Sequence, residues 1–463
     1  MELTAFHLAG LFVTLIIIMG IGIHAGKKVK DASDFSSGGH KSGSVLVAGT
    51  IAGTLVGGSS TIGTAQLAYT YGLSAWWFTI GAGLGCLILG LVFVKPLRKS
   101  GCNTIQQVIS LEYGAASGII TSVLASFGIM LNIVAQILSA NALLTSMFGI
   151  GNVESAVICV VIMSCYVIFG GVLSTGILGA IKFVLIYLSV FLGAFTALKL
   201  GGGFTQFYAA LEHGRYFNIF ARGIGIDGGA GFSVLLGVLS TQTYIQAVLS
   251  GKNDNAAKKG AIMSSVLIPP IGIGGILIGM YMGINYPSIE SNQAFPLFII
   301  NHMPPVLGGV ILATLLIALV GTGSGMALGF GTIITNDIYK IYFNKNASSK
   351  EELIVTRSVI FISLIISALL TLGNIKSAIL TWGFMSMGLR AAVLIVPMTG
   401  ALFFKGKIDK LISILSSILG FISFMSCELL FDLNIDSLIV GVLVSALTAA
   451  TGIILKKRRA TTA

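Results

Sequence analysis

Charged side chains are scarce in this sequence. Of its 463 residues only 16 are acidic and 27 are basic, so charged residues make up 9% of the chain, while 55% of the residues are hydrophobic. Soluble globular domains carry about 25% charged residues. The mean hydropathy of +0.97 points the same way. These values exclude a soluble domain of this length and predict an all-α polytopic membrane protein.

Cysteine and histidine are also few. The five cysteines are odd in number and lack the short spacings of metal sites, so we expect packed free thiols; they are Cys86, Cys102, Cys159, Cys165 and Cys427. The five histidines are scattered near the ends of apolar segments or in loops and share no site. The sequence therefore indicates no resident cofactor, no metal cluster and no enzyme active site.

Long apolar runs occupy most of the chain. A membrane-spanning helix needs about 20 mostly apolar residues. We expect thirteen transmembrane helices, at residues 4–25, 43–70, 74–95, 115–147, 153–173, 175–200, 229–250, 259–285, 305–336, 352–372, 377–403, 410–430 and 436–455. No stretch between them is typical of a separate soluble domain, so residues 1–463 are predicted to form a single transmembrane domain.

The basic residues mark one side of the membrane. Lys27, Lys28 and Lys30 follow the first segment, and most other lysines and arginines lie in alternate loops and in the tail at 456–459. The positive-inside rule then places the N-terminus outside and the C-terminus in the cytoplasm, in the plasma membrane. The net charge of +11 is thus a topology signal. We expect the basic tail to face anionic membrane lipids and not nucleic acid, and nothing indicates an obligatory protein partner.

Two of the thirteen segments are interrupted. Segments 2–6 (residues 43–200) and 7–11 (229–403) form two blocks of five, and an odd number of spans inverts the second copy. The first segment of each block contains a polar, glycine-rich stretch, GTLVGGSSTIG and GVLSTQTYIQ. Unwound backbone inside a membrane is tolerated where it lines a cavity, so both breaks predict a binding site. Alternatively, the glycines only permit close helix packing.

Seven sequence motifs carry a family resemblance. They are DFSSGGHKSG, VAGTIAGTLVGGSSTIGTAQLAYTYGLSAWW, FVKPLRKSG, TIQQVISLEYG, IFGGVLST, QTYIQAVLSGK and NDIYK. In this order, over nearly the whole chain, they resemble the sodium:solute symporter family, which has the leucine-transporter-like inverted-repeat fold. The second and sixth are most similar to the branch that contains the high-affinity choline transporters. The resemblance implies a secondary active transporter that couples solute uptake to a cation by alternating access.

The resemblance also implies a sodium site. By motif position, its backbone carbonyls belong to Gly53, Val56 and Ala318, and its hydroxyl to Thr322. Such oxygen ligands suit a hard cation. The family has a second hydroxyl at the position of Gly321, so one of the five ligands is missing here. Sodium is the coupling ion that the resemblance implies, with a proton as the alternative.

Lys182 lies deep in the sixth segment, one turn from a position where many members of the family carry an aspartate, and the resemblance makes a lysine there unusual. An ionisable side chain at that depth is a functional hypothesis by default. Its ammonium group can fill the volume that sodium fills in relatives, with Thr322 and the carbonyls of the second segment as acceptors. Because burial favours the neutral amine, this arrangement predicts a proton-coupled or sodium-independent carrier. In the alternative interpretation, Lys182 reaches cytoplasmic water along the permeation path.

Arg390 lies near the middle of the eleventh segment, and none of the 16 acidic residues lies deep in a segment. A buried guanidinium needs either carbonyl partners at helix ends or a bound anionic ligand. The second possibility predicts a small solute with a carboxylate. Choline would need an aromatic cage or a carboxylate. Leu55 stands where choline transporters have tryptophan, and Thr241 heads the second break. Both residues argue against choline as the substrate.

The predicted substrate wall combines the two breaks with one aromatic side chain on the outer side. Its residues are Ser59, Ser60, Thr61, Thr64, Thr241, Gln242, Tyr244 and Trp382. Two other classes of function share the membrane topology, namely a channel and a ligand-sensing membrane protein. Paired broken helices argue against a simple channel, and no kinase-like or receiver-like domain accompanies the membrane segments.

Overall fold

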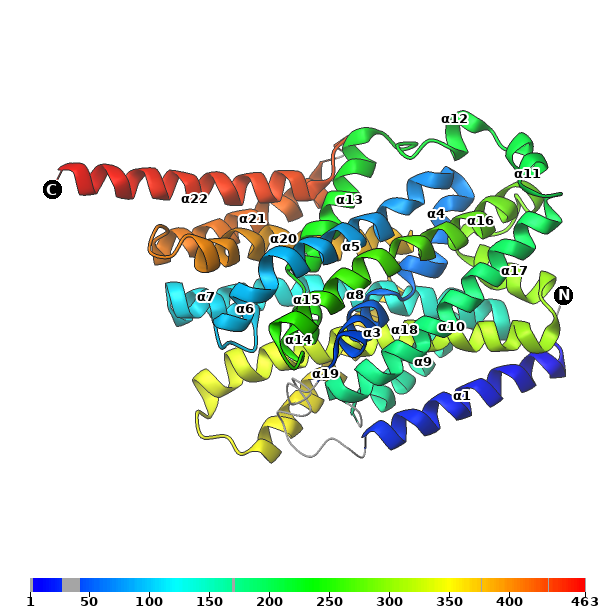
Figure 1. The fold of residues 1–463 in the computed structure, drawn as a ribbon, viewed down its shortest axis with the longest axis horizontal. Coiled ribbons are helices and arrows are strands. Elements are labelled where there is room, and N and C mark those ends of the chain that lie inside the picture. Colours follow the sequence, from blue (N-terminus) through cyan, green and yellow to red (C-terminus); the bar gives the residue numbers. More distant parts are fainter. Residues whose placement is uncertain (1–2, 27–41, 169–170, 376, 432, 463) are drawn as a thin grey trace.

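A bundle of helices makes up the protein (Figure 1). The computed structural model describes residues 3–26, 42–168, 171–375, 377–431 and 433–462. Within these ranges no β-strand occurs, and a single isolated bridge pairs Ser42 with Gly251. The all-α class predicted from the sequence is confirmed.

The helices follow one another with short connections. The first half of the chain contains α1 (Ala5–Gly26), α3 (Ser44–Leu55), η2 (Ser59–Gly63), α4 (Thr64–Tyr71), η3 (Gly72–Trp76), α5 (Trp77–Ile88), η4 (Leu89–Phe93), α6 (Val94–Lys99), α7 (Ile105–Tyr113), α8 (Ala115–Phe148), α9 (Asn152–Ile168), α10 (Gly171–Leu200), α11 (Phe204–Ala210) and α12 (His213–Tyr216). The second half contains α13 (Ile224–Leu239), α14 (Gln242–Leu249), α15 (Asp254–Leu267), α16 (Pro269–Asn285), η5 (Ser291–Gln293), α17 (Ala294–His302), α18 (Pro305–Ile333), η6 (Ile334–Phe343), α19 (Ser349–Leu372), α20 (Ile379–Phe403), α21 (Lys410–Leu430) and α22 (Ser437–Thr462).

Each of the thirteen predicted segments contains helix. Nine helices in the described part of the chain are long and apolar enough to cross a membrane, and a tenth is added if α13 and α14 form one bent span. The continuous helical run at 59–99 counts once although two segments were predicted there, and α1, α3 and α9 contribute shorter apolar stretches. The count of thirteen and the two inverted blocks therefore stay predictions.

The faces of the outer helices indicate a lipid surrounding. Ile16 on α1, Leu369 on α19 and Leu447 on α22 are all more than half exposed. In water such exposed apolar faces would favour aggregation, whereas lipid accepts them without cost. In Figure 1 the two chain ends lie at opposite ends of the bundle.

Small residues let α3 approach α10 closely. A Cβ atom added to Gly53 would lie 2.4 Å from the Cα atom of Gly179, and one added to Gly49 would lie 2.7 Å from the Cβ atom of Ala180. Backbone contacts of this kind replace the hydrophobic driving force between helices in a membrane. Gly49 and Gly53 thus have the packing role that was the alternative interpretation of the glycine-rich segment.

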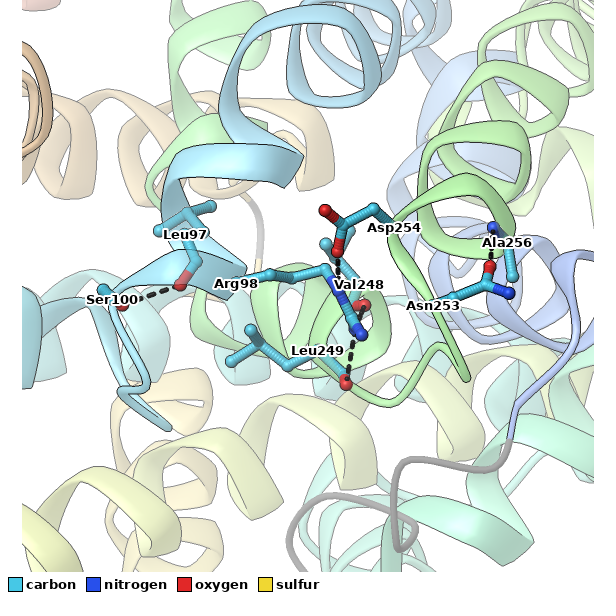
Figure 2. A network of polar contacts seen from close by, with 8 residues as sticks. All are labelled: Leu97, Arg98, Ser100, Val248, Leu249, Asn253, Asp254 and Ala256. Carbon is cyan, nitrogen blue, oxygen red and sulfur yellow. Dashed lines mark hydrogen bonds and ion pairs between the residues drawn. The ribbon is translucent and has the colours of Figure 1, made fainter.

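Arg98 ties three helices together at one end of the bundle (Figure 2). The Arg98 guanidinium, at the end of α6, donates to the backbone carbonyls of Val248 and Leu249 at the end of α14 and to the Asp254 carboxylate at the start of α15. An arginine satisfies carbonyls that a helix end leaves unpaired. The bridge at Ser42 adds the start of α3 to the same group. These four helix ends therefore form one connected unit.

Gly72 turns the chain between α4 and α5. Its φ of 56° is a conformation that side chains disfavour, and an added Cβ would lie 2.1 Å from the backbone oxygen of Tyr216. Gly72→Ala should therefore lower stability by more than the about 1–3 kcal/mol that backbone strain alone costs. Gly101→Ala is the matched control, because its φ of 70° is similar but no atom lies within 4 Å of its added Cβ. Thermal unfolding in detergent compares the two, and equal losses would contradict the steric argument.

Candidate transport site

Two helices are interrupted inside the bundle, at the positions expected from the sequence. Helix α3 ends at Leu55, Val56 has extended backbone with a ψ of 97°, and η2 begins at Ser59. Helix α13 ends at Leu239, and α14 begins at Gln242 after a 45° bend. Each break leaves backbone amide and carbonyl groups without helical partners.

Side chains supply partners for the first break. The hydroxyl groups of Ser60 and Thr61 donate to the carbonyl of Gly57, at 3.1 and 2.8 Å. The amide of Gly58 donates to Oε1 of Gln136 on α8, at 2.7 Å. Because these groups are fully buried, each unpaired one would cost several kcal/mol. Ser60 and Thr61, predicted for the substrate wall, therefore also hold the unwound backbone.

The two glycines of this break allow a close approach of neighbouring side chains. A Cβ atom on Gly57 would lie 2.5 Å from the Thr322 hydroxyl and 2.6 Å from Gln136 Oε1. One on Gly58 would lie 2.1 Å from the Ser139 hydroxyl. Sequence reasoning missed Gln136 and Ser139. The available signal was their polar side chains, which lie within the predicted membrane segment 115–147.

Residues at the second break mostly bond to backbone. The Thr241 hydroxyl donates to the carbonyl of Gly237 one turn earlier. The Gln242 amide uses both ends: Nε2 donates to the carbonyl of Asn103 at 2.8 Å, and Oε1 accepts from the amide of Ile105 at 3.1 Å. The side chain predicted to face the substrate therefore holds the start of α7.

Lys182 reaches the predicted cation site. Its side chain on α10 is 1% exposed, and Nζ donates to the carbonyl of Ala318 and to the hydroxyl of Thr322, both at 3.1 Å. The Thr322 hydroxyl donates in turn to the carbonyl of Val56 at 3.3 Å. One chain of polar contacts thus connects α10, α18 and the break after α3. Three of the four residues predicted for sodium take part in it.

Gly321 leaves room for this lysine. A Cβ atom added to Gly321 would lie 3.1 Å from Lys182 Nζ and 3.3 Å from the hydroxyl oxygen of Tyr166. A residue with a hydroxyl side chain would therefore compete with the ammonium group for the same volume. The glycine at position 321, which lacks the hydroxyl that the family resemblance implies there, thus makes room for the Lys182 ammonium group.

Arg390 is fully enclosed on α20. Its side chain is 1% exposed, and its donors reach the carbonyl and hydroxyl of Ser386 and the sulfur atoms of Met326 and Met387. Thioether sulfur is a weak acceptor. Among the described residues no carboxylate forms an ion pair with Arg390, and its carbonyl partner lies within its own helix and not at a helix end.

The remaining predicted residues differ in how they are bonded. The hydroxyl groups of Ser59 and Tyr244 are buried without a partner among the described residues. Thr64 donates to the carbonyl of Ser59, and Trp382 donates through its indole nitrogen to the Ser377 hydroxyl. Ser59 and Tyr244 are thus the predicted wall residues whose hydroxyl groups have no hydrogen-bond partner among the described residues.

Comparison with known proteins places this geometry in a family. A model of the sodium:solute symporter family matches residues 35–405. The chain belongs to the sodium:solute symporter family. A curated relative, the human (Homo sapiens) high affinity choline transporter 1, is 24% identical over 386 residues, which is 77% of this chain and 67% of the relative.

Solved structures support the fold. A sodium-coupled sialic acid symporter in a substrate-bound, outward-open state superposes with a TM-score of 0.84 at 18% identity, and 98% of each chain is covered. A nucleobase-cation-symport-1 family transporter superposes with a TM-score of 0.58 at 12% identity, covering 92% of this chain and 97% of that one. This symporter family member is therefore a multi-pass membrane transporter, and the family implies sodium as its coupling ion.

Proposed function

We propose that this symporter carries a small carboxylate-bearing solute and that the Lys182 ammonium group takes the place of the coupling sodium ion. The contact of Nζ with the Ala318 carbonyl and the Thr322 hydroxyl carries the proposal. An ammonium group has one positive charge and three donors, so it can satisfy the oxygen atoms that would otherwise coordinate a monovalent cation. Unlike sodium, it stays tethered to α10.

A tethered cation changes how transport is driven. Sodium binds and leaves with each cycle, whereas a lysine can release only its proton. The proposed carrier therefore couples solute uptake to a proton or runs without an ion gradient. The second candidate is ordinary sodium coupling through Gly53, Val56, Ala318 and Thr322, which the family favours. Transport in sodium-free buffer separates the two.

The charge balance inside the bundle supports a carboxylate. Lys182 and Arg390 are buried, and no ion pair with a carboxylate accompanies either of them in the described part of the chain. A bound carboxylate would offset this charge. The N-terminal end of α14 at Gln242 adds the positive end of a half-helix dipole, which favours an anionic group. Tyr244, in the first turn of α14, contributes a hydroxyl that has no partner in the described part of the chain.

Uptake into proteoliposomes tests this proposal directly. Radiolabelled small monocarboxylates and amino acids are offered under an inward proton gradient, an inward sodium gradient, or neither. Radiolabelled choline is offered in the same way as the cationic comparison solute. We expect accumulation of a carboxylate without sodium. Accumulation of choline would contradict the proposed carboxylate substrate. Accumulation of any solute only under a sodium gradient would contradict the replacement of sodium by Lys182.

Two glutamines support the alternating-access part of the proposal. Gln66 on α4 accepts a hydrogen bond from the amide of Ile379 at the start of α20, at 3.0 Å. Gln242 on α14 holds the start of α7 in the same manner, at the amide of Ile105. Each glutamine thus connects a broken helix to the first turn of another helix. We propose that the two contacts open in alternation as the broken helices move.

Gln66→Leu and Gln242→Leu should shift access in opposite directions. A cysteine in place of Ser59, in a background without the five native cysteines, reports access through its alkylation by impermeant reagents from each face of a proteoliposome. We expect each substitution to raise alkylation from one face only, by about tenfold for a lost contact of 1.4 kcal/mol. Gln206→Leu, an exposed change on α11, is the control. Equal increases in alkylation from both faces would contradict the proposal that the two glutamine contacts open in alternation.

A further inference from the structure

A cavity of about 250 Å³ lies apart from the buried lysine and arginine, between α13, α20 and the connection from α21 to α22. The residues that determine its chemistry are Arg222, Phe384, Phe424, Cys427, Glu428 and Asp436. They come from segments more than 200 residues apart in the chain. The transport function described above does not use any of them.

Asp436 is held in place by backbone and side-chain contacts. Its Oδ1 atom accepts from the Ser233 hydroxyl at 2.8 Å and from the amide of Leu438 at 2.9 Å. Its own amide donates to the carbonyl of Gly225, and a Cβ atom on Gly229 would lie 2.4 Å from its Cβ. The glycines of α13 therefore seat this carboxylate against the helix and leave Oδ2 without a hydrogen bond to a described residue.

The cavity has an excess of negative charge. Glu428 uses Oε2 to accept from the Ser437 hydroxyl and leaves Oε1 without a described partner. The one cation in the lining, Arg222, is already paired with Asp227, at 2.7 Å from both Nε and Nη2 to Oδ1. Arg222 attracts Asp436 at longer range, but neither Glu428 nor Asp436 forms a close ion pair with another described residue.

Aromatic rings complete the walls. Phe384, Phe424 and Phe431 line the cavity together with Met385. Aromatic faces attract cations, and Arg222 already lies over the Phe384 ring at 5.8 Å from its centroid. The same rings provide apolar surface for a carbon skeleton. Two free carboxylate oxygens beside aromatic walls fit an ammonium group that carries an apolar body.

We propose that this cavity binds a small organic ammonium compound. The ammonium group lies between Glu428 and Asp436, and the apolar part of the ligand packs on Phe424 and Phe431. The charge preference is opposite to that of the transport site, so this is a second site and not a part of the first. Its occupant would contact α13, α20 and the α21–α22 connection at once. The proposal does not rest on the identity of the transported solute.

Cys427 gives the cavity a built-in reporter. Purified protein in detergent is treated with N-ethylmaleimide, and alkylation of Cys427 is followed by peptide mass spectrometry, with Cys102 as the internal reference. The probes are phenethylammonium, 2-phenylethanol and 3-phenylpropionate, which are similar in shape and differ in charge. We expect phenethylammonium to slow alkylation of Cys427 while the alcohol and the anion do not, with no change at Cys102.

Substitution of the carboxylates supplies the decisive comparison. Glu428→Gln combined with Asp436→Asn should weaken protection by phenethylammonium by about tenfold or more, which corresponds to 1.4 kcal/mol. Glu290→Gln, on an exposed loop, should leave protection unchanged. If the double variant does not fold, Glu428→Gln alone is used, because its only described hydrogen-bond partner is the Ser437 hydroxyl, which a glutamine oxygen can still accept from. Equal protection by the alcohol, or undiminished protection in the variant, would overturn the proposal.

Discussion

The double substitution Lys182→Ala with Gly321→Ser is expected to make ligand binding depend on sodium. Removal of the lysine frees the Ala318 carbonyl and the Thr322 hydroxyl, and the serine adds a hydroxyl at the position where Nζ lies in the native protein. With the carbonyls of Gly53 and Val56, this provides five oxygen ligands for a hard cation. Sodium at 100 times its dissociation constant would then stabilise the folded protein by about 2.7 kcal/mol.

The single substitutions control for loss of packing. Lys182→Met keeps most of the side-chain volume but removes the charge and the donors, so ligand binding should fall by about tenfold or more without becoming sodium-dependent. Gly321→Ser alone places a Cβ atom 3.1 Å from Nζ and should lower thermal stability through crowding. Thermal unfolding with and without sodium measures all three variants. Sodium stabilisation of the native protein equal to that of the double variant would refute the exchange of lysine for ion.

Arg390→Met is expected to weaken ligand binding strongly while the ligand-free protein keeps or gains thermal stability. The guanidinium is fully buried with serine and two sulfur atoms as partners, and an isolated buried charge is costly. A methionine of similar length removes that cost, as hydrophobic replacements of buried charges often do. Loss of a buried charge contact to the ligand carboxylate should weaken binding by about 2–5 kcal/mol, or roughly thirtyfold or more.

Two tyrosines separate a binding role from a structural role. The hydroxyl groups of Tyr244 and Tyr113 are both buried without a described partner, but only Tyr244 lies at a helix break. Tyr244→Phe should weaken carboxylate binding by about tenfold, equivalent to 1.4 kcal/mol, and Tyr113→Phe should not. Isothermal titration calorimetry on the purified variants measures the binding of both.

For the arginine variant, thermal unfolding and the same calorimetry are compared. A strongly destabilised Arg390→Met that still binds the ligand normally would show that the arginine serves the fold.

Some parts of this arrangement follow from local sequence. The run Gly57-Gly58-Ser59-Ser60-Thr61 predicts an unwound helix because glycine permits it and hydroxyl groups within four residues can satisfy the freed carbonyls. The depth of Lys182 in an apolar segment predicts a functional role for this residue. Its contact with Thr322 could be anticipated only because the family resemblance places the sodium site on the helix that carries Thr322.

Other parts depend on tertiary packing and could not be read from one sequence. Gln66, Gln136 and Gln242 are polar residues in predicted membrane segments, and each has a partner between 78 and 313 residues away. Polarity shows that such a residue needs a partner but does not identify it. Gln242 was accordingly predicted to face the substrate, whereas its amide bonds to the backbone at the start of α7. The cavity lined by Glu428 and Asp436 likewise joins α13 to a connection far along the chain.

The most direct test of the account is the sodium dependence of ligand stabilisation in the native protein. Purified protein is screened by thermal shift against small carboxylates, and each hit is repeated in sodium and in potassium chloride at several pH values. We predict the same shift in both salts, a shift that shrinks as rising pH removes the ammonium proton, and a much smaller shift in Lys182→Met. A shift that appears only with sodium and does not change with pH would show that the ion site survives and that Lys182 does not replace the ion.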